Sequence, residues 1–205
     1  CEKIGVNIQD ISVGMGLDQR IGDRFLRAGP AYGGSCFPKD TRALIDVANK
    51  YKIDLSIVKS VVKSNNQRKI ILTKRIDKIL KNRLKNKNIT FLGVTFKPNT
   101  DDMREASSIP MINYLNKKGS KIRYYDPSGR KKEFDKLKNV KFYSSISSAC
   151  IKSDLIIIHT EWNAFKLLNF KKLVKKKNFK VFDMRNIYSQ DKMRDLKIDY
   201  TSIGR

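Results

Sequence analysis

The stretch NITFLGVTFKPNTDDMRE, residues 88–105, divides this chain of 205 residues into two parts. Its first nine residues, 88–96, are rich in β-branched and aromatic side chains, which is typical of a strand, and the polar segment after them is typical of a loop. Before residue 86 the apolar side chains recur at helical spacing, whereas after it strands and helices alternate. The stretch therefore predicts where an α/β region begins.

The region after residue 86 predicts a parallel sheet with helices on its faces, because strand and helix patterns follow one another in turn. The expected helix SSIPMINYLNKKG ends at Gly119, and Asp-Pro stops the strand KIRYYDP. Beyond the strand at 88–96, the further strands are expected at 121–127, VKFYSS, 154–160 and 180–184, and the helices at 107–119, near ISSACIKS and at 163–177.

Four polar clusters each come directly after one of these strands, namely FKPNTDDMRE, DPSGR, TEWN and DMRN. Ligands of open parallel sheets bind beyond the carboxyl ends of the strands, where such loops meet. The sequence therefore predicts a binding site at this edge. No GxGxxG follows any of the strands, so the fingerprint of a dinucleotide-binding loop is absent from the chain.

The region before residue 86 predicts helices, at 41–51 and over 57–84. The second segment contains neither proline nor glycine and places Leu72, Ile76 and Ile79 at spacings of four and three. It forms either one long helix or two nearly continuous ones. A long amphipathic helix often carries a dimer interface, and packing within one chain is an equally good interpretation.

The formal charge of +24 raises the question of nucleic acid. The lysines are spread along the whole chain, KKLVKKK at 171–177 is the only dense run, and no nucleic-acid-binding motif accompanies them, so we expect no nucleic-acid partner. The positive field should instead attract anionic small molecules such as nucleotides. The longest apolar run, at residues 155–158, is too short to span a bilayer, so we expect no membrane partner.

The three cysteines, Cys1, Cys36 and Cys150, are widely spaced and odd in number. This pattern argues against a disulfide framework and against a zinc site, so we expect no metal and a reducing, cytoplasmic setting.

Cys36 lies in GPAYGGSCFPKD, residues 29–40, before an expected helix start at Phe37 or Pro38. It then sits at or near the N-cap, where free amides, the helix dipole and Lys39 stabilise a thiolate. A buried cysteine in a tight turn is the alternative. The local chemistry favours neither the reactive thiolate nor the buried cysteine over the other.

The only histidine, His159, directly follows the apolar run at 155–158. We interpret it as a structural residue at the edge of the core, whose hydrogen bonds are satisfied within the protein. A reactive Cys36 would therefore depend on the helix terminus, on lysines and on a carboxylate such as Asp40. Thiol attack on a carbonyl suits such a site better than peptide cleavage.

Two long motifs, GGSCFPKDTRAL at 33–44 and FKPNTDDMRE at 96–105, resemble those of the nucleotide-sugar 6-dehydrogenases, the UDP-glucose/GDP-mannose dehydrogenase family. The resemblance covers essentially the whole chain, with supporting matches in MGLDQRIGDRFL, YYDP, TEWNAF and FDMRN. It implies a central helical, dimerising domain with a long helix at 1–85 and a Rossmann-like, parallel-sheet, UDP-binding α/β domain at 86–205. The family's N-terminal NAD-binding domain is missing from this chain.

The resemblance implies an NAD-dependent, four-electron oxidation of UDP-glucose to UDP-glucuronate through a thiohemiacetal and a thioester on Cys36. Members of the family form homodimers or higher homo-oligomers. GDP-mannose dehydrogenases share much of the cysteine motif and are the alternative. As an isolated piece, the chain is expected to be a nucleotide-sugar-binding and dimerisation module without turnover.

The resemblance also implies roles for individual residues. The catalytic residues are Cys36 and Asp40, and the cofactor contacts are Cys36, Phe37, Lys39 and Arg104. The substrate contacts are Arg20, offered across the dimer, and Phe25, Arg27, Gly29, Tyr32, Gly33, Phe96, Lys97 and Arg185.

Overall fold

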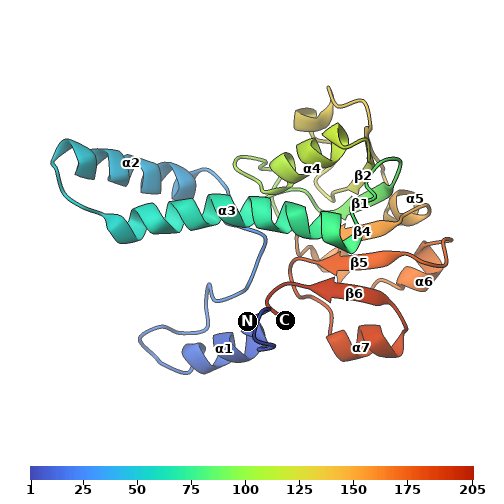
Figure 1. Cartoon of the computed structure of the whole chain (residues 1–205), viewed down its shortest axis with the longest axis horizontal. Helices are drawn as coiled ribbons and strands as arrows, with labels where there is room; N and C mark the ends of the chain where they lie inside the picture. Colours follow the sequence, from blue (N-terminus) through green and yellow to red (C-terminus); the bar gives the residue numbers. More distant parts are fainter.

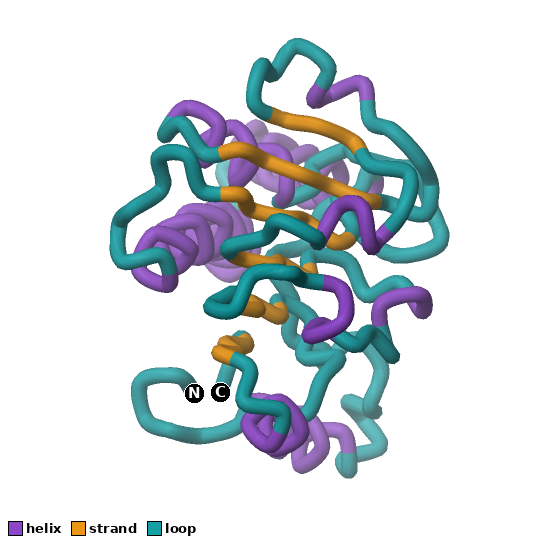
Figure 2. Tube along the Cα trace, turned by 90° about the vertical axis from the view of Figure 1, so that its right-hand side faces the viewer, coloured by secondary structure: helices purple, strands orange, loops and turns teal.

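The computed structural model describes all residues, 1–205, and is built around a six-stranded parallel sheet (Figure 2). The strands lie in the order β3-β2-β1-β4-β5-β6. They are β1 (Asn88–Leu92), β2 (Lys121–Tyr125), β3 (Val140–Phe142), β4 (Leu155–Ile158), β5 (Lys180–Asp183) and β6 (Asp199–Ser202). The α/β fold predicted for the region after residue 86 is confirmed, and β6 is a strand that the sequence did not predict.

Helices cover both faces of the sheet, which explains why β4 is the uninterrupted apolar run LIII and is wholly buried. One core of 20 residues joins the sheet to α3 (Ser56–Ile79), α4 (Ser108–Lys117) and the short η1 (Lys132–Phe134). A second core of 10 residues lies under α5 (Ile146–Cys150), η2 (Asn163–Phe165), α6 (Phe170–Leu173) and α7 (Gln190–Asp195).

A pair of long helices, α2 (Cys36–Lys50) and α3, extends away from the sheet as an arm (Figure 1). Only the second half of α3 reaches the sheet, where Leu72 and Ile76 are fully buried. The prediction of a long helix is confirmed, but its extension to residue 84 is wrong. The chain turns with positive φ angles at Lys81 and Asn82, which ends the helix.

The predicted division at residues 85 and 86 stays a prediction, because α3 shares a core with the sheet. Gly119 follows α4 with a φ of +78°, so the expected glycine stop after this helix is confirmed.

The helix predicted over 163–177 is wrong. In its place are η2, a non-helical link and the four-residue α6, whose N-cap Asn169 accepts a hydrogen bond from the Lys172 amide at 3.1 Å. The sequence also did not single out α1 (Ile8–Gly16) or α7. No helix combines the length and the apolar character that crossing a membrane requires.

Candidate functional site

The strand order reverses between β1 and β4, and the loops beyond their carboxyl ends meet there, as predicted. Arg185, just after β5, ties three of these loops together. Its Nε donates to the His159 carbonyl at 2.8 Å, and its Nη2 donates to the Phe96 carbonyl at 3.1 Å. The carboxylate of Asp126, after β2, accepts from the Val94 amide at 2.8 Å, which joins the fourth loop to the same edge.

The guanidinium of Arg185 is almost enclosed. Burial lowers the pKa of Arg185, and the carboxylates of Glu161 and Asp183 oppose that shift. Glu161 Oε2 lies 2.8 Å from Arg185 Nε. The remaining nitrogen, Nη1, has no protein partner and faces Gly29, where an added Cβ would lie only 3.0 Å from it. One donor group of a buried cation is therefore left beside the segment 25–33.

His159 belongs to the core, as the sequence suggested. Its side chain is fully buried and contacts Ser107 Oγ through Nε2 at 2.8 Å and Thr160 Oγ1 through Nδ1 at 3.1 Å. Burial lowers the pKa of His159 to about 3, so the ring is neutral at physiological pH. The only histidine of the chain is therefore part of the scaffold.

Two glycines allow the cysteine loop to lie directly on the loop after β1. The Gly34 amide donates to the Arg104 carbonyl at 2.8 Å, and Gly34 has a φ of +87°. A Cβ at Gly34 would lie 2.8 Å from the Phe96 ring, and one at Gly33 would lie 2.7 Å from the Glu105 carbonyl oxygen. The motifs at 33–44 and 96–105 are therefore in contact because these two positions have no side chain.

Cys36 is the first residue of α2, one or two residues before the predicted helix start. Its thiol is exposed, and the N-cap residue Ser35 makes no capping hydrogen bond, so the first amides of the helix are free. Such amides and the helix dipole stabilise a thiolate. The alternative of a buried cysteine in a turn does not fit this exposure.

Two cations stand near Cys36, and each also holds a carboxylate. Lys39 Nζ lies 2.9 Å from Asp40, which raises the pKa of Lys39, with a smaller contribution from the charge of Cys36. Arg104 Nη2 lies 2.8 Å from Asp102, and the pKa of Arg104 is raised mainly by this pair and to a lesser degree by Cys36. Of the side chains expected to act in catalysis and cofactor binding, Cys36, Lys39 and Asp40 thus lie at the exposed start of α2, and Arg104 lies near them in the loop after β1.

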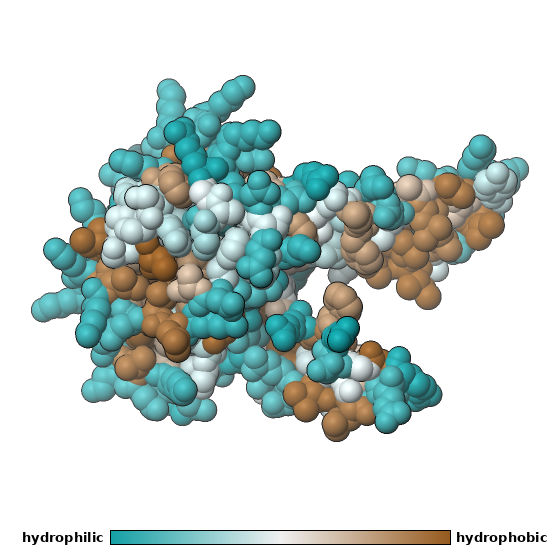
Figure 3. Space-filling view, turned by 180° about the vertical axis from the view of Figure 1, so that it is seen from behind, coloured by the Kyte–Doolittle hydropathy of each residue, from teal (hydrophilic) through white to brown (hydrophobic).

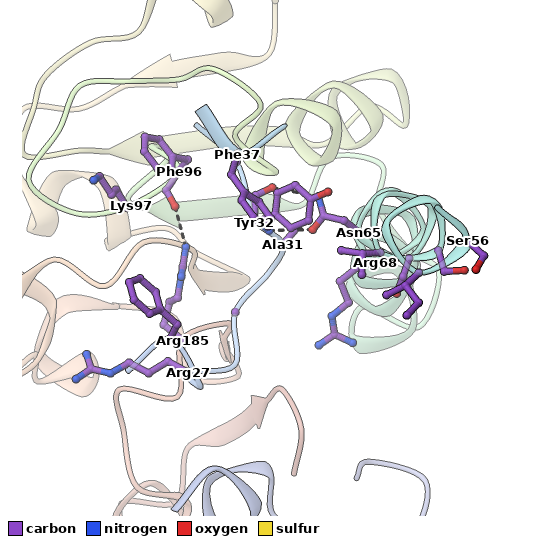
Figure 4. Close-up of a pocket in the computed structure, with 17 residues that line it drawn as sticks. Arg27, Ala31, Tyr32, Phe37, Ser56, Asn65, Arg68, Phe96, Lys97 and Arg185 are labelled. Atoms are coloured by element: carbon purple, nitrogen blue, oxygen red, sulfur yellow. Dashed lines mark hydrogen bonds between the residues drawn. The ribbon is translucent and has the colours of Figure 1, made fainter. Parts of the chain in front are cut away.

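A cavity of about 1340 Å³ opens between α3, the segment 25–37 and the strand-end loops (Figure 4). Every predicted substrate residue except Arg20 lines it. The lining residues are Phe25, Arg27, Gly29, Ala31, Tyr32, Gly33, Phe37, Ser56, Ile57, Ser60, Val61, Ser64, Asn65, Arg68, Phe96, Lys97 and Arg185.

Arg20 lies away from this cavity. Its side chain is 88% exposed and pairs with Asp18, Nη2 to Oδ2, at 2.6 Å. The single chain therefore does not bring Arg20 to the site, and its role across a dimer stays a prediction.

The face of α3 that lines the cavity was not identified from the sequence. Asn65 holds the backbone of Tyr32 by accepting from its amide at 2.9 Å and donating to its carbonyl at 3.2 Å. Ser60, Ser64 and Arg68 repeat at a spacing of four and form the polar stripe of this face. That polar spacing was the available signal, and Leu72 and Ile76 continue it at the same spacing of four, so the polar stripe of the first half of α3 leads into the apolar stripe of its second half.

A second contact that was missed joins the arm to the sheet. Glu105, in the loop after β1, lies 2.9 Å from Arg42 of α2 and 3.3 Å from Lys69 of α3. The hydrogen bond from Arg42 and, in smaller measure, the contact with Lys69 lower the pKa of Glu105, against the opposing effect of burial. One carboxylate thus clamps both helices of the arm.

The lining carries four cationic side chains, Arg27, Arg68, Lys97 and Arg185, and no aspartate or glutamate. Aromatic rings complete it, and Tyr32 packs edge-on against Phe37 with ring centroids 4.7 Å apart. In Figure 4 the rings of Phe96, Phe37 and Tyr32 lie above the side chains of Arg27 and Arg68. A cavity with aromatic surfaces and an excess of positive charge is suited to an anion that carries a flat ring.

Comparison with known proteins agrees with this geometry. A UDP-glucose 6-dehydrogenase of Rickettsia typhi is 43% identical over 207 residues, which cover 100% of this chain and 48% of the relative. One of Bacillus subtilis is 42% identical over 212 residues, covering 100% of this chain and 47% of the relative. The chain thus spans about half the length of these curated relatives.

A solved structure supports the same comparison. The UDP-glucose dehydrogenase of the hyperthermophilic archaeon Pyrobaculum islandicum superimposes with a TM-score of 0.84 at 28% identity, covering 98% of this chain and 44% of that one.

Family models match both parts of the chain. The central domain of the UDP-glucose/GDP-mannose dehydrogenase family matches residues 1–67, and the UDP-binding domain of the same family matches residues 90–190. Together the two matches cover well over half of the sequence. Each match includes one of the two motifs that lie in contact at the cavity. The chain belongs to the UDP-glucose/GDP-mannose dehydrogenase family.

Proposed function

We propose that this chain supplies the nucleophile and the nucleotide-sugar site of an NAD-dependent UDP-glucose 6-dehydrogenase. The reaction oxidises C6 of UDP-glucose from alcohol to carboxylate and yields UDP-glucuronate. The observation that carries the proposal is the cavity, which has four cations, no carboxylate and aromatic walls beside the start of the cysteine helix. The names of the curated relatives support the choice of substrate.

In this proposal the cavity binds UDP-glucose along its length. Phe96 stacks on the uracil ring, and Lys97, whose Nζ lies 5.4 Å from the centroid of that phenyl ring, neutralises phosphate nearby. Arg185 donates from Nη1 to the diphosphate. Phe25, Arg27, Gly29, Tyr32 and Gly33 hold the sugar-nucleotide from the facing segment. Arg20 would come from a partner subunit.

Cys36 and Asp40 carry the chemistry. At the aldehyde stage the Cys36 thiolate adds to the C6 carbonyl carbon, and the new oxyanion takes a proton, which gives a thiohemiacetal. Loss of a hydride from C6 and of the hydroxyl proton converts this adduct into a thioester. Asp40 then orients water and accepts its proton as hydroxide attacks C6. The C–S bond breaks, releasing UDP-glucuronate and the thiolate.

The cofactor contacts are Cys36, Phe37, Lys39 and Arg104. They fit an anionic dinucleotide, because they form an exposed surface with two cations beside the thiol. NAD, when bound, accepts one hydride in each of the two oxidations. We place the protein in the reducing cytoplasm, where the exposed Cys36 thiol stays reduced.

Ligand-induced stabilisation tests the proposal. The melting temperature of the 205-residue chain is measured with UDP, UDP-glucose and GDP-mannose, since a ligand that binds only the folded state raises it. UDP and UDP-glucose should raise the melting temperature at concentrations where GDP-mannose has no effect. A shift with GDP-mannose alone would replace the proposed substrate, and no shift with any of the three would contradict the proposed site.

A further inference from the structure

Among the four cationic side chains of the cavity, Arg68 is the one that is partly buried and has no ion pair, since Arg27 and Lys97 are exposed and Arg185 pairs with Glu161. It is half-buried on α3 and forms neither a hydrogen bond nor an ion pair with the rest of the chain. The acid whose charge acts on Arg68, Glu2, contacts other groups through Oε1, namely Arg75 Nη1 at 2.5 Å and the Gly204 amide at 2.7 Å. Arg68 is therefore a cation without an ion pair of its own, because the one acid whose charge acts on it is bound to Arg75.

This arrangement is unfavourable without a ligand. Burial lowers the pKa of Arg68, and the like charge of Arg75 acts in the same direction, with Glu2 opposing both. The next cation along α3, Lys69, is instead compensated by Glu105 at 3.3 Å. A partly desolvated cation gains most from a counter-ion that enters its own site, and the cavity lining offers no carboxylate to act as one.

The position of Arg68 indicates which anion it meets. Arg68 and Gly29 line the main cavity together and also line a smaller adjoining cavity. Gly29 is the residue that faces the free Nη1 of Arg185. Two guanidinium groups, one from α3 and one from just after β5, thus line one cavity together with Gly29, and they come from different elements of the fold.

We propose that Arg68 is a further binding residue of this site, which pairs with the diphosphate of the nucleotide sugar from the side opposite Arg185. The inference rests on the proposed function. A guanidinium presents its N–H groups in a planar fork that matches two phosphate oxygens, whereas a lysine offers a single point charge. Bound diphosphate would then connect α3 to the strand-end loops, which the chain itself joins through the ion pair of Lys69 with Glu105.

The test compares the affinities of the 205-residue chain for UDP and for uridine, measured by calorimetry, before and after Arg68→Gln. A charge-assisted hydrogen bond is worth about 1.5–3 kcal/mol, so UDP should bind about 10- to 100-fold more weakly to the variant. Affinity for uridine, which lacks phosphate, should not change. The dependence of UDP affinity on salt should also become less steep.

Lys74→Gln is the matched control, because Lys74 is an exposed cation on α3 outside the cavity lining. It should leave both affinities unchanged. Arg68→Lys, which keeps the charge and loses the fork, should weaken UDP binding several-fold, and it decides the question if Arg68→Gln does not fold. Equal UDP affinity in the folded Arg68 variants and in the unaltered chain overturns the inference. A chain that does not bind UDP at all would instead contradict the proposed function.

Discussion

Gly34 shows how a single residue holds the site together. Its amide bonds the Arg104 carbonyl, its φ of +87° favours glycine, and a Cβ there would lie 2.8 Å from the ring of Phe96. The contact between the cysteine loop and the loop after β1 thus depends on a position without a side chain. Gly33 has no positive φ, but it also has no room for a side chain, because an added Cβ would lie against the Glu105 carbonyl.

We predict that Gly34→Ala destabilises the chain by about 1–3 kcal/mol, because it combines backbone strain with the clash against Phe96. UDP affinity should fall as well, since Phe96 lines the cavity. Chemical denaturation gives the unfolding free energy. Gly129→Ala is the control, because Gly129 has a φ of +91° but nothing within 4 Å of an added Cβ. Equal losses in the two variants would show that the contact with Phe96 has no energetic weight.

At the scale of elements, Glu105 links the arm to the sheet. It lies in the loop after β1, has a positive φ of 55°, and pairs with Arg42 of α2 and Lys69 of α3. A non-glycine residue in this backbone region is strained, and here the strain aims the carboxylate at both helices. The position of α2, and hence of Cys36, therefore depends on this clamp.

We predict that Glu105→Gln lowers the unfolding free energy by about 1 kcal/mol at neutral pH. The pKa of Glu105 is lowered in the folded state, so its contribution is present above the ordinary value of 4.5 and is lost as pH falls below 4.5 through the folded pKa. The difference between the two proteins should therefore shrink below pH 4.5. Glu133→Gln, an exposed glutamate without an ion pair, is the control. A difference that persists undiminished in acid would refute the clamp.

The elements that the sequence predicted well have strong local signals. β1, β2, β4 and β5 are apolar runs, and α4 is closed by Gly119. The prediction of one helix over 163–177 failed for two reasons. Asn169 caps a new short helix, and Phe165, Phe170 and Val174 enter the core at spacings of five and four. Its Leu167 is 96% exposed. β6 is half polar, and its pairing with β5 decides its conformation.

For the candidate site, too, the features with a local sequence signal were predicted and the long-range contacts were not. The two long motifs were visible in the sequence, and the meeting of the four polar clusters followed from strand ends sharing one edge. The contact of the cysteine motif with the first of these clusters was not predicted, because the cysteine motif follows no strand. The partners that hold them together were not visible, because each joins residues far apart. Tyr32 and Asn65 are separated by 33 positions and Arg42 and Glu105 by 63. No local pattern encodes such a pair, and only the assembled fold brings its members into contact.

For the molecule as a whole, the outstanding feature is the apolar surface of the arm. Figure 3 shows hydrophobic residues gathered on the arm and on the smaller helical projection beneath it. On α2, Leu44 and Val47 are each about half exposed, and Tyr51, just after the helix, is 66% exposed. An exposed apolar patch of this kind marks an interaction surface. We infer that it is buried between subunits of a homodimer or higher homo-oligomer.

We predict that the chain sediments as a dimer or larger species, and that Leu44→Glu with Val47→Glu shifts it to monomer by weakening association at least about tenfold, because charges would be buried at the interface. Analytical ultracentrifugation provides the measurement. Leu196→Glu is the control, since Leu196 is 50% exposed on the opposite part of the molecule. A wild-type chain that stays monomeric at high concentration would rule out this interface.

The most direct test of the account is the rate of NADH formation from UDP-glucose and NAD by the full-length enzyme, compared with its Cys36→Ser variant. Cys1→Ser serves as the control. Loss of the covalent nucleophile should reduce the rate at least about a thousandfold, while the control keeps its activity. The 205-residue chain alone should form no NADH. Normal turnover by Cys36→Ser would contradict the central claim that Cys36 is the covalent nucleophile of this site.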